Sequence, residues 1–238
     1  MTDRPKAEQI PFNLPSQPAM GRADFLQAPS NALALATVEA PAGLPAGTLV
    51  LIGPEGSGKT HLACVWAERT KALWQDPLTL ARDLPAIVAA PDVVAVALDN
   101  ASLVVGDEGE EALFHLVNHL RGRGQLLLTA RQSVRDWNLG LPDLVSRLTA
   151  AAHVALAEPD EALLGAVLVK LFNDRQLRVQ PALIDFLLGR MERSLAAAGS
   201  LVERLDARAL RLRRPITRSL AQEVFAEDLD NQDPDGAS

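Results

Sequence analysis

Short, nearly continuous apolar runs alternate with longer amphipathic segments in the first two thirds of the chain. Such runs are typical of strands buried on both faces of a parallel sheet, and the segments between them have the periodicity of helices. The pattern predicts an α/β core over 23–158. Its strands are expected within TLVLIG (48–53), VVAVALDN (93–100), QLLLTAR (125–131) and HVALAEP (153–159).

Residues 159–227 show a different periodicity. Apolar positions recur there at spacings of three and four, with no strand pattern between them. This predicts a small all-helical subdomain packed after the core, with helices near 160–175, 181–190, 193–211 and 218–227.

The two ends of the chain show no regular period. Residues 1–22 favour an extended tail because they contain Pro5, Pro11, Pro15 and Pro18. The acidic end, 228–238, is expected to be disordered.

The stretch GPEGSGKTH at 53–61 lies between the first apolar run and an amphipathic segment. Its spacing fits the phosphate-binding P-loop, in which small residues let backbone N–H groups close around an anion. Lys59 is expected to reach the β- and γ-phosphates, and the Thr60 hydroxyl to ligate Mg²⁺ at a helix N-terminus. The sequence predicts nucleotide contacts from Gly53, Gly56, Gly58, Lys59, Thr60 and neighbouring His61, although His61 is more simply interpreted as a helix-surface residue.

Asp99 ends the apolar run at 93–100 and is the candidate acid that holds Mg²⁺ through water. Asn100 follows it, where many ATPases of this layout have a second carboxylate that polarises the attacking water. Because an amide orients water but cannot take its proton, we expect slow intrinsic hydrolysis.

Two arginines are candidates for acting on phosphates. Arg147, in LPDLVSRL (141–148), occupies a region where oligomeric P-loop ATPases often direct an arginine at the neighbour's γ-phosphate; the alternative is a surface or capping arginine. Arg193, in the helical part, could approach the phosphates from the other side, or lie on a solvated helix face.

Read together, several segments resemble one family. FLQAPSNALAL, GPEGSGKTHLA, LDN followed by GDE, NLGLPDLVSRL and RSLAAAGSLVERLD are similar to the AAA+ module of the bacterial replication initiator DnaA, and most of all to its short regulatory homologues, the Hda family. The resemblance runs from about 9 to 225. It implies that Phe25 and Asn31 border the adenine, that Asp99 is the Walker B acid, and that Arg147 and Arg193 are the arginine finger and the sensor 2 arginine.

The sequence also departs from DnaA. It reads Thr129, Ala130, Arg131 where DnaA usually has an acidic residue, so Thr129 is the best polar candidate for sensor 1. DnaA continues into a helix-turn-helix DNA-binding domain and this sequence does not, so we expect a protein other than the initiator. The basic stretch RALRLRRP (208–215) could contact DNA phosphates, but cations near a helix C-terminus ordinarily complement the helix dipole.

QIPFNL at 9–14 resembles the short motif with which Hda proteins and many polymerases bind the replication sliding clamp. The resemblance implies that Gln9 bonds the rim of the clamp pocket and that Ile10, Phe12 and Leu14 enter its groove. An extended, proline-flanked peptide suits this mode of binding.

Composition narrows the classes of partner and cellular location that the sequence allows. A net charge of −7 and a pI near 5.1 give no overall field for holding nucleic acid, so contact with DNA is expected only locally or through a partner. The single cysteine, Cys64, excludes an internal disulfide and is expected on a core face. No apolar run has the length of a signal or membrane span, which favours a cytoplasmic protein without a membrane partner.

The resemblance implies a sliding-clamp-associated regulator that promotes hydrolysis of DnaA-bound ATP and so prevents re-initiation. Its expected ligands are ADP or ATP with Mg²⁺, and its expected partners are the clamp, DnaA and, through the clamp, DNA; homo-oligomers stay open. One alternative is a DnaA-derived adaptor or anchor that targets a client without stimulating hydrolysis. Another is an autonomous ATPase or loader, which Asn100 disfavours.

Overall fold

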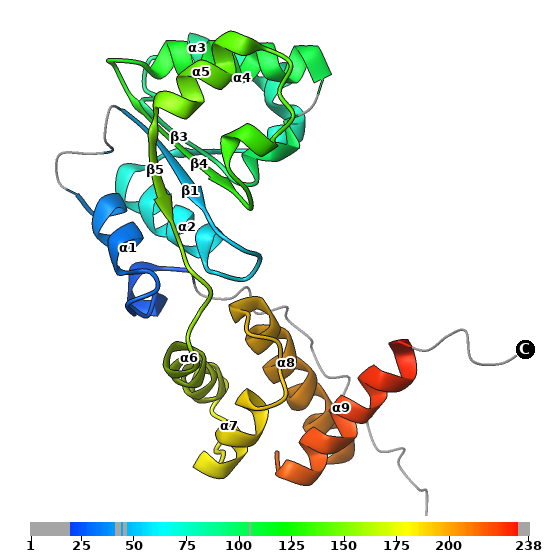
Figure 1. The fold of residues 1–238 in the computed structure, drawn as a ribbon. Helices are drawn as coiled ribbons and strands as arrows, with labels where there is room; N and C mark the ends of the chain where they lie inside the picture. Colours follow the sequence, from blue (N-terminus) through cyan, green and yellow to red (C-terminus); the bar gives the residue numbers. More distant parts are fainter. Residues whose placement is uncertain (1–19, 41–43, 45–46, 105, 233–238) are drawn as a thin grey trace, which may run out of the picture.

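The computed structural model describes residues 20–40, 44, 47–104 and 106–232. Within these ranges an α/β core is followed by a group of helices (Figure 1). The segment with the expected clamp motif, 9–14, lies outside the described residues.

Within the described residues, five parallel strands form one sheet in the order β2-β3-β4-β1-β5. The α/β prediction is thereby confirmed, and four of the strands fall within or overlap the expected apolar runs. The fifth, β2, was not predicted, because three residues at a sheet edge are too few to show a period. The strands are β1 (Thr48–Ile52), β2 (Leu73–Gln75), β3 (Ala95–Leu98), β4 (Gln125–Ala130) and β5 (Ala152–Ala155).

Alternate side chains of the strands face two helical layers. Val50 of β1 packs in one hydrophobic cluster with side chains of α3, α4 and α5, whereas Leu49 and Leu51 pack in another with α1 and α2. Figure 1 shows the sheet between these two sets of helices. The helices of the core are α1 (Ala32–Val38), α2 (Lys59–Thr70), α3 (Leu80–Ala89), α4 (Gly106–Leu120) and α5 (Pro142–Ala150), with short 3-10 turns η1 (Arg22–Asp24), η3 (Pro77–Thr79), η4 (Ala101–Leu103) and η5 (Val134–Asp136).

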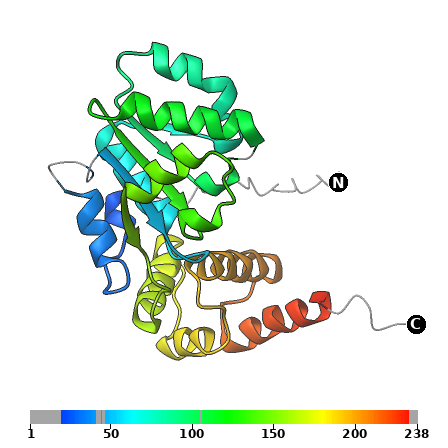
Figure 2. The ribbon, with the colours of Figure 1, turned by 45° about the horizontal axis from the view of Figure 1, so that its top comes forward.

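The lid is the group of helices that follows the core, and it has its own hydrophobic cluster. It consists of α6 (Glu161–Asp174), α7 (Pro181–Leu188), α8 (Leu195–Leu212) and α9 (Arg218–Gln232). Figure 2 shows these helices together on one side of the core. All four expected helices are present, but α9 continues past 227, so the first part of the segment expected to be disordered is helical.

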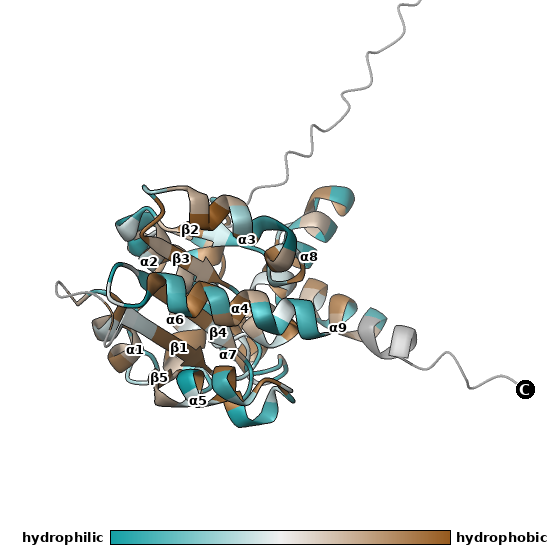
Figure 3. Ribbon diagram, turned by 90° about the horizontal axis from the view of Figure 1, so that it is seen from above, coloured by the Kyte–Doolittle hydropathy of each residue, from teal (hydrophilic) through white to brown (hydrophobic). Residues whose placement is uncertain are grey.

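Hydropathy follows this architecture. Figure 3 shows hydrophobic residues concentrated in the central strands, whereas helices such as α4 alternate hydrophobic and hydrophilic residues. No helix in the described part of the chain is both long enough and apolar enough to span a bilayer.

Cys64 on α2 is half-buried rather than enclosed in the core, and its Sγ lies 3.7 Å from Sδ of Met20. Burial raises the pKa of the Cys64 thiol.

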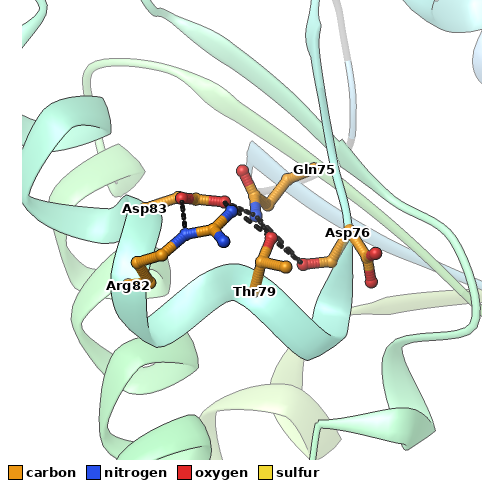
Figure 4. A network of polar contacts seen from close by, with 5 residues as sticks. All are labelled: Gln75, Asp76, Thr79, Arg82 and Asp83. Atoms are coloured by element: carbon orange, nitrogen blue, oxygen red, sulfur yellow. Dashed lines mark hydrogen bonds and ion pairs between the residues drawn. The ribbon is translucent and has the colours of Figure 1, made fainter.

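A polar network around the buried side chain of Gln75 holds the edge of the sheet where β2 ends (Figure 4). The Gln75 amide is directed at Asp76 O, Thr79 Oγ1 and Asp83 Oδ2 at 3.0, 3.0 and 3.1 Å. Hydrogen bonds from Arg82, Thr79 and Gln75 hold the pKa of the Asp83 carboxyl well below its usual range. The network satisfies Gln75, which is buried, and fixes the turn into α3.

Candidate phosphate-binding site

The loop 53–58 joins the carboxyl end of β1 to the start of α2. Gly56 and Gly58 have φ angles of +68° and +96°, a region in which glycine carries no steric penalty. Gly58 is the N-cap of α2 and makes no side-chain capping bond. The positive end of the α2 dipole is therefore directed at the loop, as an anion-binding site requires.

Lys59 lies beneath this loop and is 6% exposed. Its Nζ donates to the carbonyl oxygens of Gly53 and Pro54 at 2.8 and 2.7 Å. Burial lowers the pKa of the Lys59 ammonium, and the charge of Asp99 partly opposes this. Among the described residues, the acceptors of the ammonium are these two carbonyl oxygens, and a phosphate oxygen would be a stronger acceptor.

Ser57 provides an independent test of whether an anion fits the loop. Its side chain is 3% exposed, and within the described residues its Oγ has no hydrogen-bond partner. Buried hydroxyl groups normally have a hydrogen-bond partner. An unpartnered hydroxyl in this loop therefore indicates that an atom of a ligand accepts its hydrogen bond. The residues present therefore fit a phosphate group.

The carboxyl ends of β3 and β4 bring three further predicted residues to α2. Thr60 Oγ1 donates to Asp99 Oδ2 at 3.0 Å, and Thr129 Oγ1 donates to Asp99 Oδ1 at 2.5 Å. The backbone N–H of Asn100 donates to Thr129 Oγ1 at 2.9 Å, and Asn100 adopts φ +53°. Thr129 is fully buried, so it orients Asp99 and the backbone of Asn100.

The described residues contain no group of three or more His, Cys, Asp or Glu side chains that could hold a metal ion by themselves. Mg²⁺ at this point would need phosphate oxygens and water in addition to Thr60 and Asp99. This is the mode of binding that Mg²⁺ prefers.

The lid reaches the loop at the start of α8. Leu195 N–H donates to Gly56 O at 2.8 Å, and Ser194 caps α8 by accepting from Ala197 N–H. Arg193 immediately precedes this contact, but its side chain is 66% exposed and lies 3.8 Å from Glu161 Oε2. The structure thus brings the backbone of Arg193 close to the loop and pairs its guanidinium within the lid.

This arrangement matches solved structures. Domain III of the Thermotoga maritima replication initiation protein DnaA superposes with a TM-score of 0.76 at 16% identity, covering 90% of this chain and 98% of that one. Aquifex aeolicus DnaA bound to AMPPCP gives 0.67 at 18% identity, covering 80% and 66%. The chain has the AAA+ P-loop NTPase fold. The Thermotoga maritima RuvB branch migration motor gives 0.61 at 17% identity, covering 76% and 61%, and no protein-family model matches the sequence.

The N-terminal segment of the core, at η1 and just after it, packs against α2. Phe25 is buried, and its ring meets that of His61 edge-on, with centroids 5.2 Å apart. His61 Nε2 lies 3.1 Å from Gly21 O. His61 is half-buried in this contact, and its interpretation as a helix-surface residue rather than a catalytic one stays a prediction.

Asn31 stabilises the turn that leads into α1. It is buried; its Oδ1 accepts from Ala28 N–H and its Nδ2 donates to Leu26 O, both at 2.9 Å. Its side-chain amide is therefore occupied by the backbone of its own turn.

The structure brings Phe25 next to Gly58 of the P-loop. A Cβ added at Gly58 would lie 3.8 Å from the Phe25 ring.

Arg147 lies apart from the residues around Lys59. It belongs to α5, in the helical layer that Figure 1 shows on the side of the AAA+ core away from the lid. Its guanidinium carbon lies 5.3 Å from the centroid of the Phe114 ring on α4. Arg147 therefore makes a cation–π contact with Phe114.

Two contacts of the site were missed from the sequence. Arg131, directly after β4, forms a 2.8 Å ion pair with Glu55 of the P-loop. Ser194 approaches Gly56 so closely that a Cβ at Gly56 would lie 1.9 Å from Ser194 Oγ. The helix-start pattern at 194–197 could have indicated the cap, but nothing local indicates which loop it meets.

Proposed function

We propose that this chain is a regulator of the Hda type, which uses its AAA+ core to promote hydrolysis of ATP bound to DnaA while it is attached to the sliding clamp. The observation that carries the proposal is the fold match to DnaA domain III across 90% of this chain and 98% of that one. Sequence segments that resemble DnaA and Hda include the P-loop, the LDN segment at the end of β3 and the start of α8, which meet at the site, as well as α5, which carries Arg147.

The chain binds an adenine nucleotide with Mg²⁺. Lys59 and Ser57 would hold phosphate oxygens, and Thr60 with Asp99 would hold the metal, which neutralises phosphate charge when bound. The P-loop and α8 meet at Gly56, so a ligand in the loop also bears on the position of the lid. The nucleotide acts mainly as a conformational ligand.

Intrinsic turnover is slow in this proposal. Asn100 supplies an amide where a carboxylate would accept the proton of the attacking water. Its backbone is fixed by Thr129, so the amide can position water without activating it. The catalytic group of this chain instead acts on the ATP bound to its partner.

Arg147 is the residue proposed to act on the partner's ATP. It lies on the outer helical layer rather than beside its own Lys59, which is consistent with a guanidinium that serves a neighbouring molecule. A guanidinium directed at a γ-phosphate stabilises transition-state charge. Attachment to the clamp through Gln9, Ile10, Phe12 and Leu14 stays a prediction, since these residues lie outside the described ranges.

Hydrolysis of DnaA-bound ATP, measured with this protein and DNA-loaded clamp and with each omitted in turn, tests the proposal. We expect acceleration only when both are present. An adaptor or anchor would bind without accelerating hydrolysis, and an autonomous ATPase would consume its own ATP rapidly without DnaA. Either of these results would overturn the proposed function.

A further inference from the structure

Glu55 and Arg131 connect two loops at the phosphate-binding site. Glu55 Oε2 and Arg131 Nη1 are 2.8 Å apart. Strands β1 and β4 are neighbours in the sheet, and Gly53 N–H donates to Ala130 O at 3.2 Å, which extends their pairing into the loops. The backbone of Arg131 therefore lies directly beside the first residue of the P-loop.

The charges of this pair act on Lys59. Burial is the main reason that the pKa of Lys59 is lowered; the positive charge of Arg131 lowers it further, and the negative charge of Glu55 opposes that effect. Arg131 thus adds a second positive charge close to the buried ammonium. Glu55 opposes the effect of this charge on Lys59 while the two side chains are paired.

The pair is well exposed, with 60% of the Arg131 side chain and 67% of the Glu55 side chain accessible. Exposed ion pairs contribute little to stability because water screens them and both side chains lose freedom. Arg131 can therefore leave Glu55 at small cost. A phosphate oxygen is a competing acceptor with more charge and suitable geometry for a guanidinium.

We propose that Arg131 is a specificity-determining residue that exchanges Glu55 for the terminal phosphate of a bound nucleoside triphosphate. The inference rests on the proposed nucleotide binding and deepens it. A triphosphate carries the extra charge that draws Arg131 away from Glu55, whereas a diphosphate leaves the pair intact. The two residues together set the preference of the site between ATP and ADP.

The test compares the affinities of ADP and a non-hydrolysable ATP analogue, each with Mg²⁺, for the parent and for three variants. Arg131→Gln is expected to weaken binding of the analogue about tenfold more than that of ADP, the size of one charge-assisted hydrogen bond. Glu55→Gln is expected to tighten the analogue, because Arg131 no longer has a competing partner. Arg135→Gln, an exposed arginine in the same loop region, is the matched control and is expected to change neither affinity.

The double variant Arg131→Gln with Glu55→Gln separates direct contact from simple neutralisation of Glu55. If Arg131 contacts the terminal phosphate, the double variant keeps the reduced preference for the analogue. Two results would overturn the inference and leave the proposed nucleotide binding standing. One is recovery, in the double variant, of the parent's preference for the analogue over ADP. The other is an unchanged preference in Arg131→Gln while ADP still binds. Failure of the parent to bind either nucleotide overturns both.

Discussion

The backbone N–H of Leu195 donates a 2.8 Å hydrogen bond to the carbonyl oxygen of Gly56. One residue of the P-loop is thereby joined to the first residue of lid helix α8. The position of α8 therefore depends on the backbone of the loop that fits a phosphate. This contact gives a direct physical route between ligand and lid.

Gly56→Ala is expected to disturb that route. The added Cβ would lie 1.9 Å from Ser194 Oγ, and φ of +68° is unfavourable for alanine, so α8 must move away. We expect a loss of about 1–3 kcal/mol in unfolding free energy from a strained left-handed residue, together with weaker ADP binding. Denaturant unfolding and calorimetric titration measure the two effects.

Gly122→Ala is the matched control for Gly56→Ala. Gly122 has φ of +75° in the turn between α4 and β4, and nothing lies within 4 Å of an added Cβ. It therefore carries the backbone strain without the clash. Equal ADP affinities in the two variants would contradict the proposed coupling of P-loop and lid.

Thr129→Val is expected to weaken the Mg²⁺-dependent part of nucleotide binding. The change removes the donor to Asp99 and leaves Asn100 N–H without its acceptor. A buried group left unpaired costs about 1–3 kcal/mol of stability. Thr129→Ser keeps the hydroxyl and should restore both stability and binding in titrations with and without Mg²⁺. A valine variant that behaves like the parent would exclude this role for Thr129.

The sequence was informative where one segment carries the signal. The apolar runs located β1, β3, β4 and β5, and the spacing of the P-loop located Lys59 and Thr60 at the start of a helix. Asp99 and Thr129 could be expected to meet because parallel strands present their carboxyl ends at one edge. Their hydrogen bond follows from this geometry but was not predicted from the sequence.

The sequence was uninformative where two segments determine a contact. The pairing of Arg131 with Glu55 depends on strand order, which no local pattern encodes. The approach of Ser194 to Gly56 depends on how the lid packs, and His61 is half-buried only because the N-terminal segment folds back over α2. These are consequences of tertiary packing rather than of residue spacing.

Asp24→Asn is expected to weaken the attachment of α6 to the N-terminal segment at neutral pH. Lys170 forms a 2.8 Å ion pair with Asp24, and its hydrogen bond is the main reason that the pKa of Asp24 is lowered, with the charge of Lys170 contributing. A lowered carboxyl pKa stabilises the fold above the unfolded value near 3.9, and the contribution is lost as the pH falls through the lowered value.

The destabilisation by Asp24→Asn should therefore be up to about 1 kcal/mol at pH 7 and should vanish in acid. Urea unfolding across this pH range measures it. Asp174→Asn is the control, because Asp174 pairs with the same Lys170 only within α6. A difference from the parent that persists unchanged below the lowered pKa of Asp24 would show that the ion pair is not its cause.

Replacing Gln9, Phe12 and Leu14 by Ala is expected to abolish binding to the sliding clamp and to leave the fold unchanged. Short extended peptides bind such grooves through a few side chains, so their loss removes most of the contact. Surface-based binding to immobilised clamp measures the effect. Ser16→Ala with Gln17→Ala, outside the motif, should bind like the parent; normal clamp binding by the triple variant would reject the motif.

Arg147→Ala tests the central claim most directly, in an assay of DnaA-bound ATP hydrolysis with DNA-loaded clamp. An arginine finger contributes roughly 10³- to 10⁵-fold in rate in related P-loop systems, so its loss removes nearly all stimulation. Arg147→Lys should rescue little because lysine lacks the planar fork. Arg121 is an exposed arginine just after α4, and Arg121→Ala should stimulate normally. We predict that Arg147→Ala binds nucleotide and clamp but does not accelerate hydrolysis; acceleration equal to that of the parent would contradict the mechanism.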